Sequence, residues 1–114
     1  MVKNFVYAFI RGLNKPIILW LLYVKPRSGY ELMKEFAKLT GQKLKPGIVY
    51  PFLHHLEKGG FTIGKWIEKG KRKIKYYSLT KKGERLLDRV RNFFNMPIKE
   101  LITDMLAEKE DQLV

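Results

Sequence analysis

The segment from Lys45 to Gly83 constrains the fold of this chain more than any other part of the sequence. It begins with a run of helical periodicity that ends at Gly59 and Gly60, and two runs rich in β-branched and aromatic residues follow, at 61–69 and 74–80. Between these runs lies the sequence KGKRK, which is suited to a basic turn. A helix followed at once by a basic β-hairpin can place one element in a DNA groove and the other along the neighbouring phosphates. The segment therefore predicts a DNA-binding unit.

The charge of the chain also indicates a polyanionic partner. The 114 residues include 23 Lys and Arg against 11 Asp and Glu, which gives a formal net charge of +12. Residues 1–97 hold 21 of the basic and 6 of the acidic residues, whereas residues 98–114 hold 2 and 5. A chain with a basic body and an acidic C-terminal segment is suited to bind nucleic acid or an acidic membrane surface through its body.

The absence of cysteine limits the chemistry of the chain. It excludes disulfides, zinc sites with cysteine ligands and thiol catalysis, and it fits a reducing compartment. The apolar run 17–24 is shorter than the roughly 20 residues of a membrane span, and the N-terminus lacks the pattern of a secretory signal. We therefore expect a cytoplasmic protein that is not inserted in a membrane.

Apolar periodicity predicts four shorter helices and a long C-terminal one. Asn14 is suited to cap the second helix, and Ser28 and Glu31 have the spacing of a capping box at the start of the third. The predicted helices cover residues 2–13, 15–24, 29–40, 47–58 and 81–114, the last of them kinked or divided at Pro97. This order predicts a mainly α fold with a small β-hairpin (α+β), of the winged helix–turn–helix type. Residues 1–80 would form the DNA-binding domain with its N-terminal helix, and residues 81–114 a dimerisation helix.

The helix predicted over 47–58 has two different faces. At 100° per residue, one face is apolar and consists of Ile48, Val49, Phe52, Leu53 and Leu56. The opposite face consists of Gly47, Tyr50, Pro51, His54 and Lys58. A helix that begins near Gly47 would place Pro51 among the first-turn positions whose N–H groups have no partner in the helix. We expect the apolar face to lie on the core and the opposite face to contact DNA.

Two groups of side chains on this unit are candidates for DNA contacts. Tyr50 and His54 lie one turn apart and could reach base edges together. Lys43 and Lys45 precede the helix, whose N-terminal N–H groups and dipole attract phosphate. The hairpin supplies a second cationic surface for phosphate or the minor groove: Lys69, Lys71, Arg72, Lys73 and Lys75. The alternative is that both surfaces are only solvated.

Several other polar and aromatic residues have two possible roles. Ser28 and Tyr30 could donate hydrogen bonds to phosphate, or they could be a helix cap and a core tyrosine. Tyr76 and Tyr77 alternate along a strand, so one of them should face the core and the other should face outward.

Three motifs give the sequence a closer likeness. The runs SGYELMKEF, PGIVYPFLHHLEKGG and GKRKIKYYSLTKKG resemble the PadR family of transcriptional regulators, in order and in spacing, over roughly residues 13 to 90. The resemblance implies a homodimeric winged-helix repressor whose C-terminal helices form the dimer and which often responds to small phenolic, aromatic or drug-like compounds. Ile48 departs from the family pattern, which commonly has a small hydroxyl residue after the glycine. That departure removes one expected phosphate hydrogen bond and allows Ile48 to pack inward.

The apolar residues at the two ends of the chain predict a homodimer. They are Phe5, Phe9, Ile10, Leu86, Val90, Phe93, Phe94, Leu101 and Met105. In the alternative, the N-terminal and C-terminal helices cover each other within one chain. A two-fold dimer would place two recognition helices about one helical turn of DNA apart, which predicts an operator with an inverted repeat.

Four aromatic residues are candidates for a ligand site. Trp20, Trp66, Phe93 and Phe94 could enclose a flat hydrophobic effector, or they could belong to the core. His54 and His55 are adjacent on a helix and point about 100° apart, which does not suit a shared metal ion. The sequence has no catalytic constellation and indicates no metal or cofactor, so we do not expect an enzyme. Besides a sequence-specific repressor, an architectural DNA-coating protein and a protein-interaction module remain open.

Overall fold

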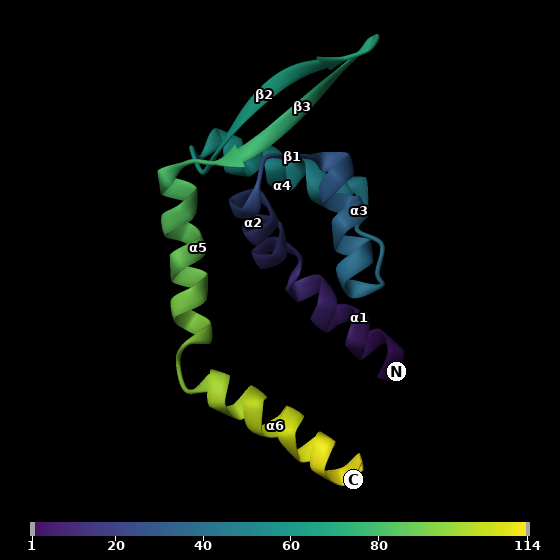
Figure 1. Cartoon of the computed structure of the whole chain (residues 1–114), viewed down its shortest axis with the longest axis vertical. Helices are drawn as coiled ribbons and strands as arrows, with labels where there is room; N and C mark the ends of the chain where they lie inside the picture. Colours follow the sequence, from purple (N-terminus) through teal and green to yellow (C-terminus); the bar gives the residue numbers. More distant parts are fainter. Residues whose placement is uncertain (1, 114) are drawn as a thin grey trace.

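Helices pack around one core, and a β-hairpin projects from it (Figure 1). The structure is a computed structural model that describes residues 2–113. The elements are α1 (Val2–Gly12), α2 (Asn14–Val24), β1 (Arg27–Ser28), α3 (Gly29–Thr40), α4 (Pro46–Lys58), β2 (Thr62–Lys69), β3 (Arg72–Leu79), α5 (Lys81–Phe94) and α6 (Ile98–Leu113). The three strands form an antiparallel sheet in the order β1-β3-β2. The predicted fold class, mainly helical with a small sheet, is confirmed.

The core lies where α2, α3 and α4 meet. Its largest fully buried side chains come in pairs from these helices: Ile18 and Leu22, Leu32 and Phe36, Val49 and Leu53. Each such side chain contributes about 1.5–3 kcal/mol on burial. Tyr77 of β3 and Leu87 of α5 extend the core toward the sheet and the C-terminal helix.

The two faces of α4 are as predicted. Val49, Leu53 and Leu56 are buried, and Ile48 and Phe52 pack half-buried beside them. The opposite face is exposed along its length, at Gly47, Tyr50, Pro51, His54 and Lys58. The inward packing of Ile48 accounts for an apolar residue so near the start of this helix.

The position of Pro51 within α4 differs from the prediction. The helix begins at Pro46, with Lys45 as its N-cap, so Pro51 lies in its second turn. The N–H of Val49 already donates to the Lys45 carbonyl (3.1 Å), and Pro51 therefore removes a regular bond to the Gly47 carbonyl. Gly47 is exposed, so water can satisfy that carbonyl.

The residues predicted to cap α2 and α3 are confirmed for α3 but not for α2. Ser28 and Glu31 form the predicted capping box at the start of α3, with bonds of 3.0 and 3.1 Å. Gly41 ends that helix in the left-handed conformation, at φ 71°. The prediction for Asn14 was wrong: Leu13 is the N-cap of α2, and Asn14 is the first residue of the helix and is buried.

The hairpin turn is shorter than the five residues KGKRK. The strands pair from Thr62 with Leu79 out to Lys69 with Arg72, so only Gly70 and Lys71 form the turn. Gly70 has φ 65°, which suits the first central position of a type II′ turn. Strand β1 was not predicted; it pairs Arg27 with Tyr77 and Ser28 with Tyr76.

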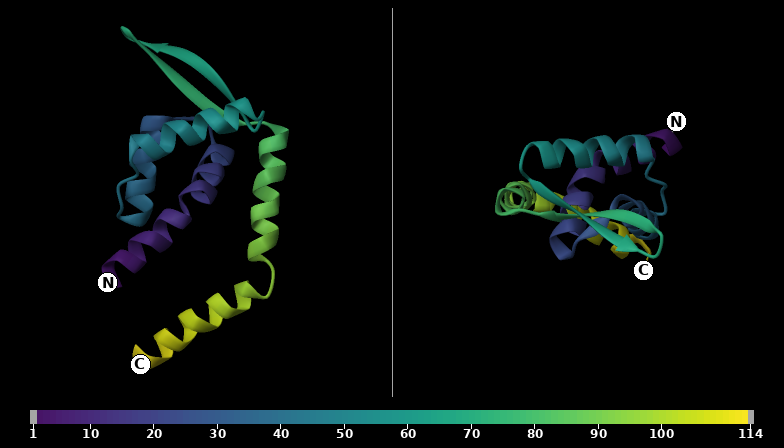
Figure 2. Two further views of the ribbon diagram at one scale, coloured as in Figure 1. Left: turned by 180° about the vertical axis from the view of Figure 1, so that it is seen from behind. Right: turned by 90° about the horizontal axis from the view of Figure 1, so that it is seen from above.

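The C-terminal segment is divided at Pro97, in agreement with the prediction of a kink or a division. Helix α5 packs on α2, whereas α6 turns away and lies at the end of the molecule opposite the hairpin (Figures 1 and 2). A single long helix is therefore replaced by two helices of 14 and 16 residues. Within residues 2–113, no helix is both long enough and apolar enough to cross a membrane.

Candidate nucleic-acid interface

An open groove of about 950 Å³ lies between the hairpin and the start of α3. Its walls come from three parts of the chain that are far apart in sequence: residues 28–31, Tyr50 of α4, and Trp66, Lys69 and residues 72–77 of the hairpin. The groove has both aromatic and cationic side chains along it, with Tyr30 and Trp66 largely exposed. Exposed cations beside aromatic faces are suited to a nucleic-acid backbone and its bases.

Tyr50 lines this groove from α4. Its ring lies against the backbone of Gly29, where a methyl group would come within 2.5 Å of Tyr50 Cε1. The side chain is nevertheless 46% exposed, so one part of the ring rests on the start of α3 and the rest faces the groove. His54 is exposed one turn further along α4. The structure thus brings the two predicted base-contacting residues to one accessible face.

Ser28 and Tyr30 have different surroundings. Ser28 is only 5% exposed, and its hydroxyl oxygen accepts the N–H of Glu31, which favours the capping role. Tyr30 is 67% exposed at the edge of the groove, so it is not a core residue and can reach a phosphate.

The hairpin cations are of two kinds. Four of them are exposed around the turn: Lys69, Lys71, Arg72 and Lys73. The ammonium of Lys69 lies 5.2 Å from the ring centre of Tyr76, and a hydrogen bond with that side chain raises the pKa of Lys69. These residues carry positive charge that is open to solvent and available to a polyanion.

Lys75 differs from the other hairpin cations because it is already paired. Its Nζ lies 2.7 Å from Oε1 of Glu57, which belongs to α4. Sequence reasoning missed this pair. The available signal was that Glu57 is the only acidic residue between Gly41 and Ile67.

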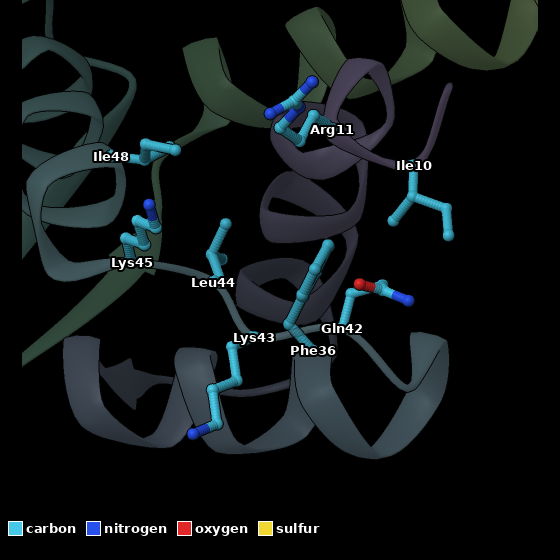
Figure 3. A pocket seen from close by; sticks show the side chains of 8 residues that line it. All are labelled: Ile10, Arg11, Phe36, Gln42, Lys43, Leu44, Lys45 and Ile48. Atoms are coloured by element: carbon cyan, nitrogen blue, oxygen red, sulfur yellow. The ribbon is translucent and has the colours of Figure 1, made fainter. Parts of the chain in front are cut away.

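A smaller cavity of about 210 Å³ lies beside the start of α4 (Figure 3). Its apolar wall consists of Ile10, Phe36, Leu44 and Ile48, and Arg11, Gln42, Lys43 and Lys45 complete the lining. In Figure 3 the side chains of Phe36 and Leu44 lie side by side, while the ammonium of Lys43 points away from them. Lys43 and Lys45 are exposed, as a phosphate-binding role requires.

The terminal apolar residues are divided between two environments. Ile10, Leu86 and Val90 pack against the core of their own chain. The remaining six, Phe5, Phe9, Phe93, Phe94, Leu101 and Met105, are exposed. The alternative in which α1 and α6 cover each other within one chain is therefore not what the structure has.

The four aromatic residues considered for an effector are not brought together. Trp20 stacks at 5.6 Å on Tyr23, and the guanidinium of Arg91 lies 5.2 Å from the centre of each ring. Phe93 and Phe94 contact each other edge-on, and Trp66 lines the groove. Neither of the two hollows includes Trp20, Phe93 or Phe94.

The two adjacent histidines do not form a joint site. The ring centres of His54 and His55 lie 6.3 Å apart, with a tilt of 59° between the rings. In the part of the chain that the structure describes, no three His, Cys, Asp or Glu residues are grouped so as to hold a metal ion.

Comparison with known proteins agrees with this geometry. The model of the "Transcriptional regulator PadR-like family" matches residues 18–89, which is more than half of the chain. A search of curated protein sequences gave no significant match. Among solved structures, a PadR family transcriptional regulator from Eggerthella lenta is 28% identical with a TM-score of 0.77, and the match covers 92% of this chain and 91% of that one.

Two further structures have similar folds. A putative transcriptional regulator from Thermoplasma acidophilum is 28% identical with a TM-score of 0.67, covering 89% of this chain and 95% of that one. A transcriptional regulator from Clostridium thermocellum is 26% identical with a TM-score of 0.71, covering 85% and 93%.

Proposed function

The chain belongs to the PadR-like family of transcriptional regulators, and on that premise we propose that it is a homodimeric, sequence-specific repressor. Members of this family are DNA-binding regulators and not enzymes. The observation that carries the proposal is the groove that Tyr50 lines together with three exposed cations of the hairpin, Lys69, Arg72 and Lys73. Tyr50 and His54 would contact base edges in the major groove, while the hairpin would follow the phosphates.

The proposed dimer would cover the exposed apolar residues at the two ends of the chain. Phe9 of α1 is 64% exposed and Leu101 of α6 is 66% exposed. Leaving such residues in water forfeits about 25 cal/mol for each Å² of apolar surface that could be buried. A second copy related by a two-fold axis would bury the two helices of both chains in one interface. Two recognition helices then face the DNA, so the operator is expected to be an inverted repeat.

The proposed repressor would release DNA on binding a small effector in the cavity beside α4. The apolar wall and the cations around it suit a ligand with an apolar body and one anionic end. A ligand there would contact Ile48 and Lys45, which lie in the first turn of α4 and at its N-cap. It would therefore compete with phosphate for the same end of the helix.

A competition experiment tests the proposal against its alternatives. The protein is bound to a selected site at physiological salt, and an excess of random duplex is added. A repressor retains a preference of roughly 10³-fold or more for its site. Equal affinity for both duplexes would indicate an architectural DNA-coating protein, and no binding to either would favour a module that binds another protein.

A further inference from the structure

An ion pair joins α4, the proposed recognition helix, to the hairpin. Lys75 of β3 donates a hydrogen bond of 2.7 Å to Glu57 of α4, and their side chains are 25% and 32% exposed. This hydrogen bond raises the pKa of Lys75, so its ammonium is charged at neutral pH. The pair lies next to Tyr76 and Tyr77, where β3 is bonded to β1. Beyond this point the hairpin projects from the body of the molecule (Figure 1).

Gly64 of β2 provides the space for this pair. A methyl group at residue 64 would lie 2.6 Å from Oε2 of Glu57 and would collide with Cε of Lys75. The Lys75 ammonium also lies 5.7 Å from the ring centre of Trp66 and 5.2 Å from that of Tyr77. A carboxylate and two aromatic rings thus surround this cation, whereas Lys71, Arg72 and Lys73 are open to solvent.

We propose that Lys75 is a positioning residue, which fixes the angle between the hairpin and α4 through Glu57, and not a phosphate-binding residue. The inference rests on the proposed DNA-binding function. A cation that is already paired displaces few counterions when DNA binds, so it contributes little to the salt dependence of the affinity. Its contribution comes through geometry, because the hairpin reaches the phosphates only when it is held at the correct angle to the recognition helix.

The two possible roles of Lys75 predict opposite effects of changing Glu57. If Lys75 binds phosphate, Glu57 is a negative charge close to DNA, and Glu57→Gln should tighten binding. If the pair holds the hairpin in place, Glu57→Gln should weaken binding. The experiment measures the dissociation constant of the full chain for one operator duplex between about 50 and 200 mM salt, the range in which phosphate contacts are distinguishable.

The proposal predicts a shared effect of the two single variants. Glu57→Gln and Lys75→Met should each lower the affinity for the operator by about threefold to tenfold. The double variant should bind no more weakly than the single variant of lower affinity, because both substitutions remove the same interaction. The dependence of log Kd on log salt stays as in the unchanged protein. As controls, Lys73→Ala lowers that slope by about one unit, and Glu68→Gln, which removes an exposed negative charge from the same hairpin, leaves binding unchanged or tightens it.

Gly64→Ala tests the geometry without changing any charge. The new methyl group displaces the ends of two flexible side chains and meets no backbone atom among its three nearest neighbours, so the chain should fold. We expect the same loss of affinity as for Glu57→Gln, with an unchanged salt slope. Thermal unfolding of each variant checks that the fold is intact.

Two results would separate the failure of this inference from that of the proposed function. If Lys75→Met lowers the slope by about one unit and Glu57→Gln tightens binding, Lys75 binds phosphate and the inference is wrong, while the DNA-binding function stands. If the unchanged protein binds no duplex at all, the proposed function itself fails.

Discussion

The ring of Tyr50 on α4 rests on the backbone of Gly29, the first residue of α3. Only a residue without a side chain leaves room for this contact, because a methyl group would come within 2.5 to 2.9 Å of three atoms of the ring. The contact holds the ring in the wall of the groove while the side chain remains partly exposed. Gly29 therefore positions the residue that we assign to base contacts.

Gly29→Ala should reduce the discrimination between operator and random DNA. The methyl group would push the Tyr50 ring away from α3, and a misplaced base contact costs about 1–3 kcal/mol of discrimination. Competition binding with Gly29→Ala and Tyr50→Ala measures this, and both should lose specificity to a similar degree. Full specificity in Gly29→Ala would show that the position of the ring does not matter.

Lys73→Ala should weaken binding to all duplexes about equally. Lys73 is exposed near the hairpin turn, so it is expected to bind phosphate and to carry no sequence information. The slope of log Kd against log salt should fall by about one unit. An unchanged slope would mean that the hairpin does not touch the backbone.

Substitutions at the neighbouring residues Leu53 and His54 should change different properties: the first lowers the stability of the fold, and the second lowers the specificity of DNA binding. Leu53 is fully buried, so Leu53→Ala should lower the free energy of unfolding by about 2–5 kcal/mol. His54 is exposed, so His54→Ala should change stability by no more than about 0.5 kcal/mol and should lower specificity. Denaturant unfolding and competition binding of both variants test this; a large loss of stability in His54→Ala would contradict the assigned orientation of α4.

Leu101→Asp should convert the proposed dimer to monomer. Leu101 is exposed on α6, and a carboxylate at this position would be buried in the proposed interface without a partner. Sedimentation at micromolar concentration measures the change. Ile63→Asp is the matched control, because Ile63 is also exposed but lies on β2, in the hairpin at the end of the molecule opposite α6 (Figure 1). A monomer already in the unchanged protein would refute the dimer.

Features with a strong local signal were predictable from the sequence. The buried and exposed faces of α4 follow from helical periodicity, which does not depend on where the helix begins. The capping box of Ser28 and Glu31 has a fixed spacing, and so could be recognised without a structure. Residue types at the hairpin likewise predicted two strands.

Other features depend on contacts between distant residues and could not be predicted in this way. Strand β1 has two residues, too few for any periodic pattern, and it forms only because β3 offers a partner. The pairing of Glu57 with Lys75 joins residues 18 positions apart, and no local pattern indicates it. The basic character of the hairpin therefore placed Lys75 among the residues predicted to bind phosphate. Pro51 lies inside α4 because packing of the apolar face outweighs one lost hydrogen bond.

Selection of bound sites from random or genomic duplex fragments tests the central claim most directly. If two recognition helices of a two-fold dimer contact base edges, the selected fragments should share an inverted repeat with half-sites about one helical turn apart. Fragments without a common motif, or with a single half-site that is not repeated, would contradict a sequence-specific dimer.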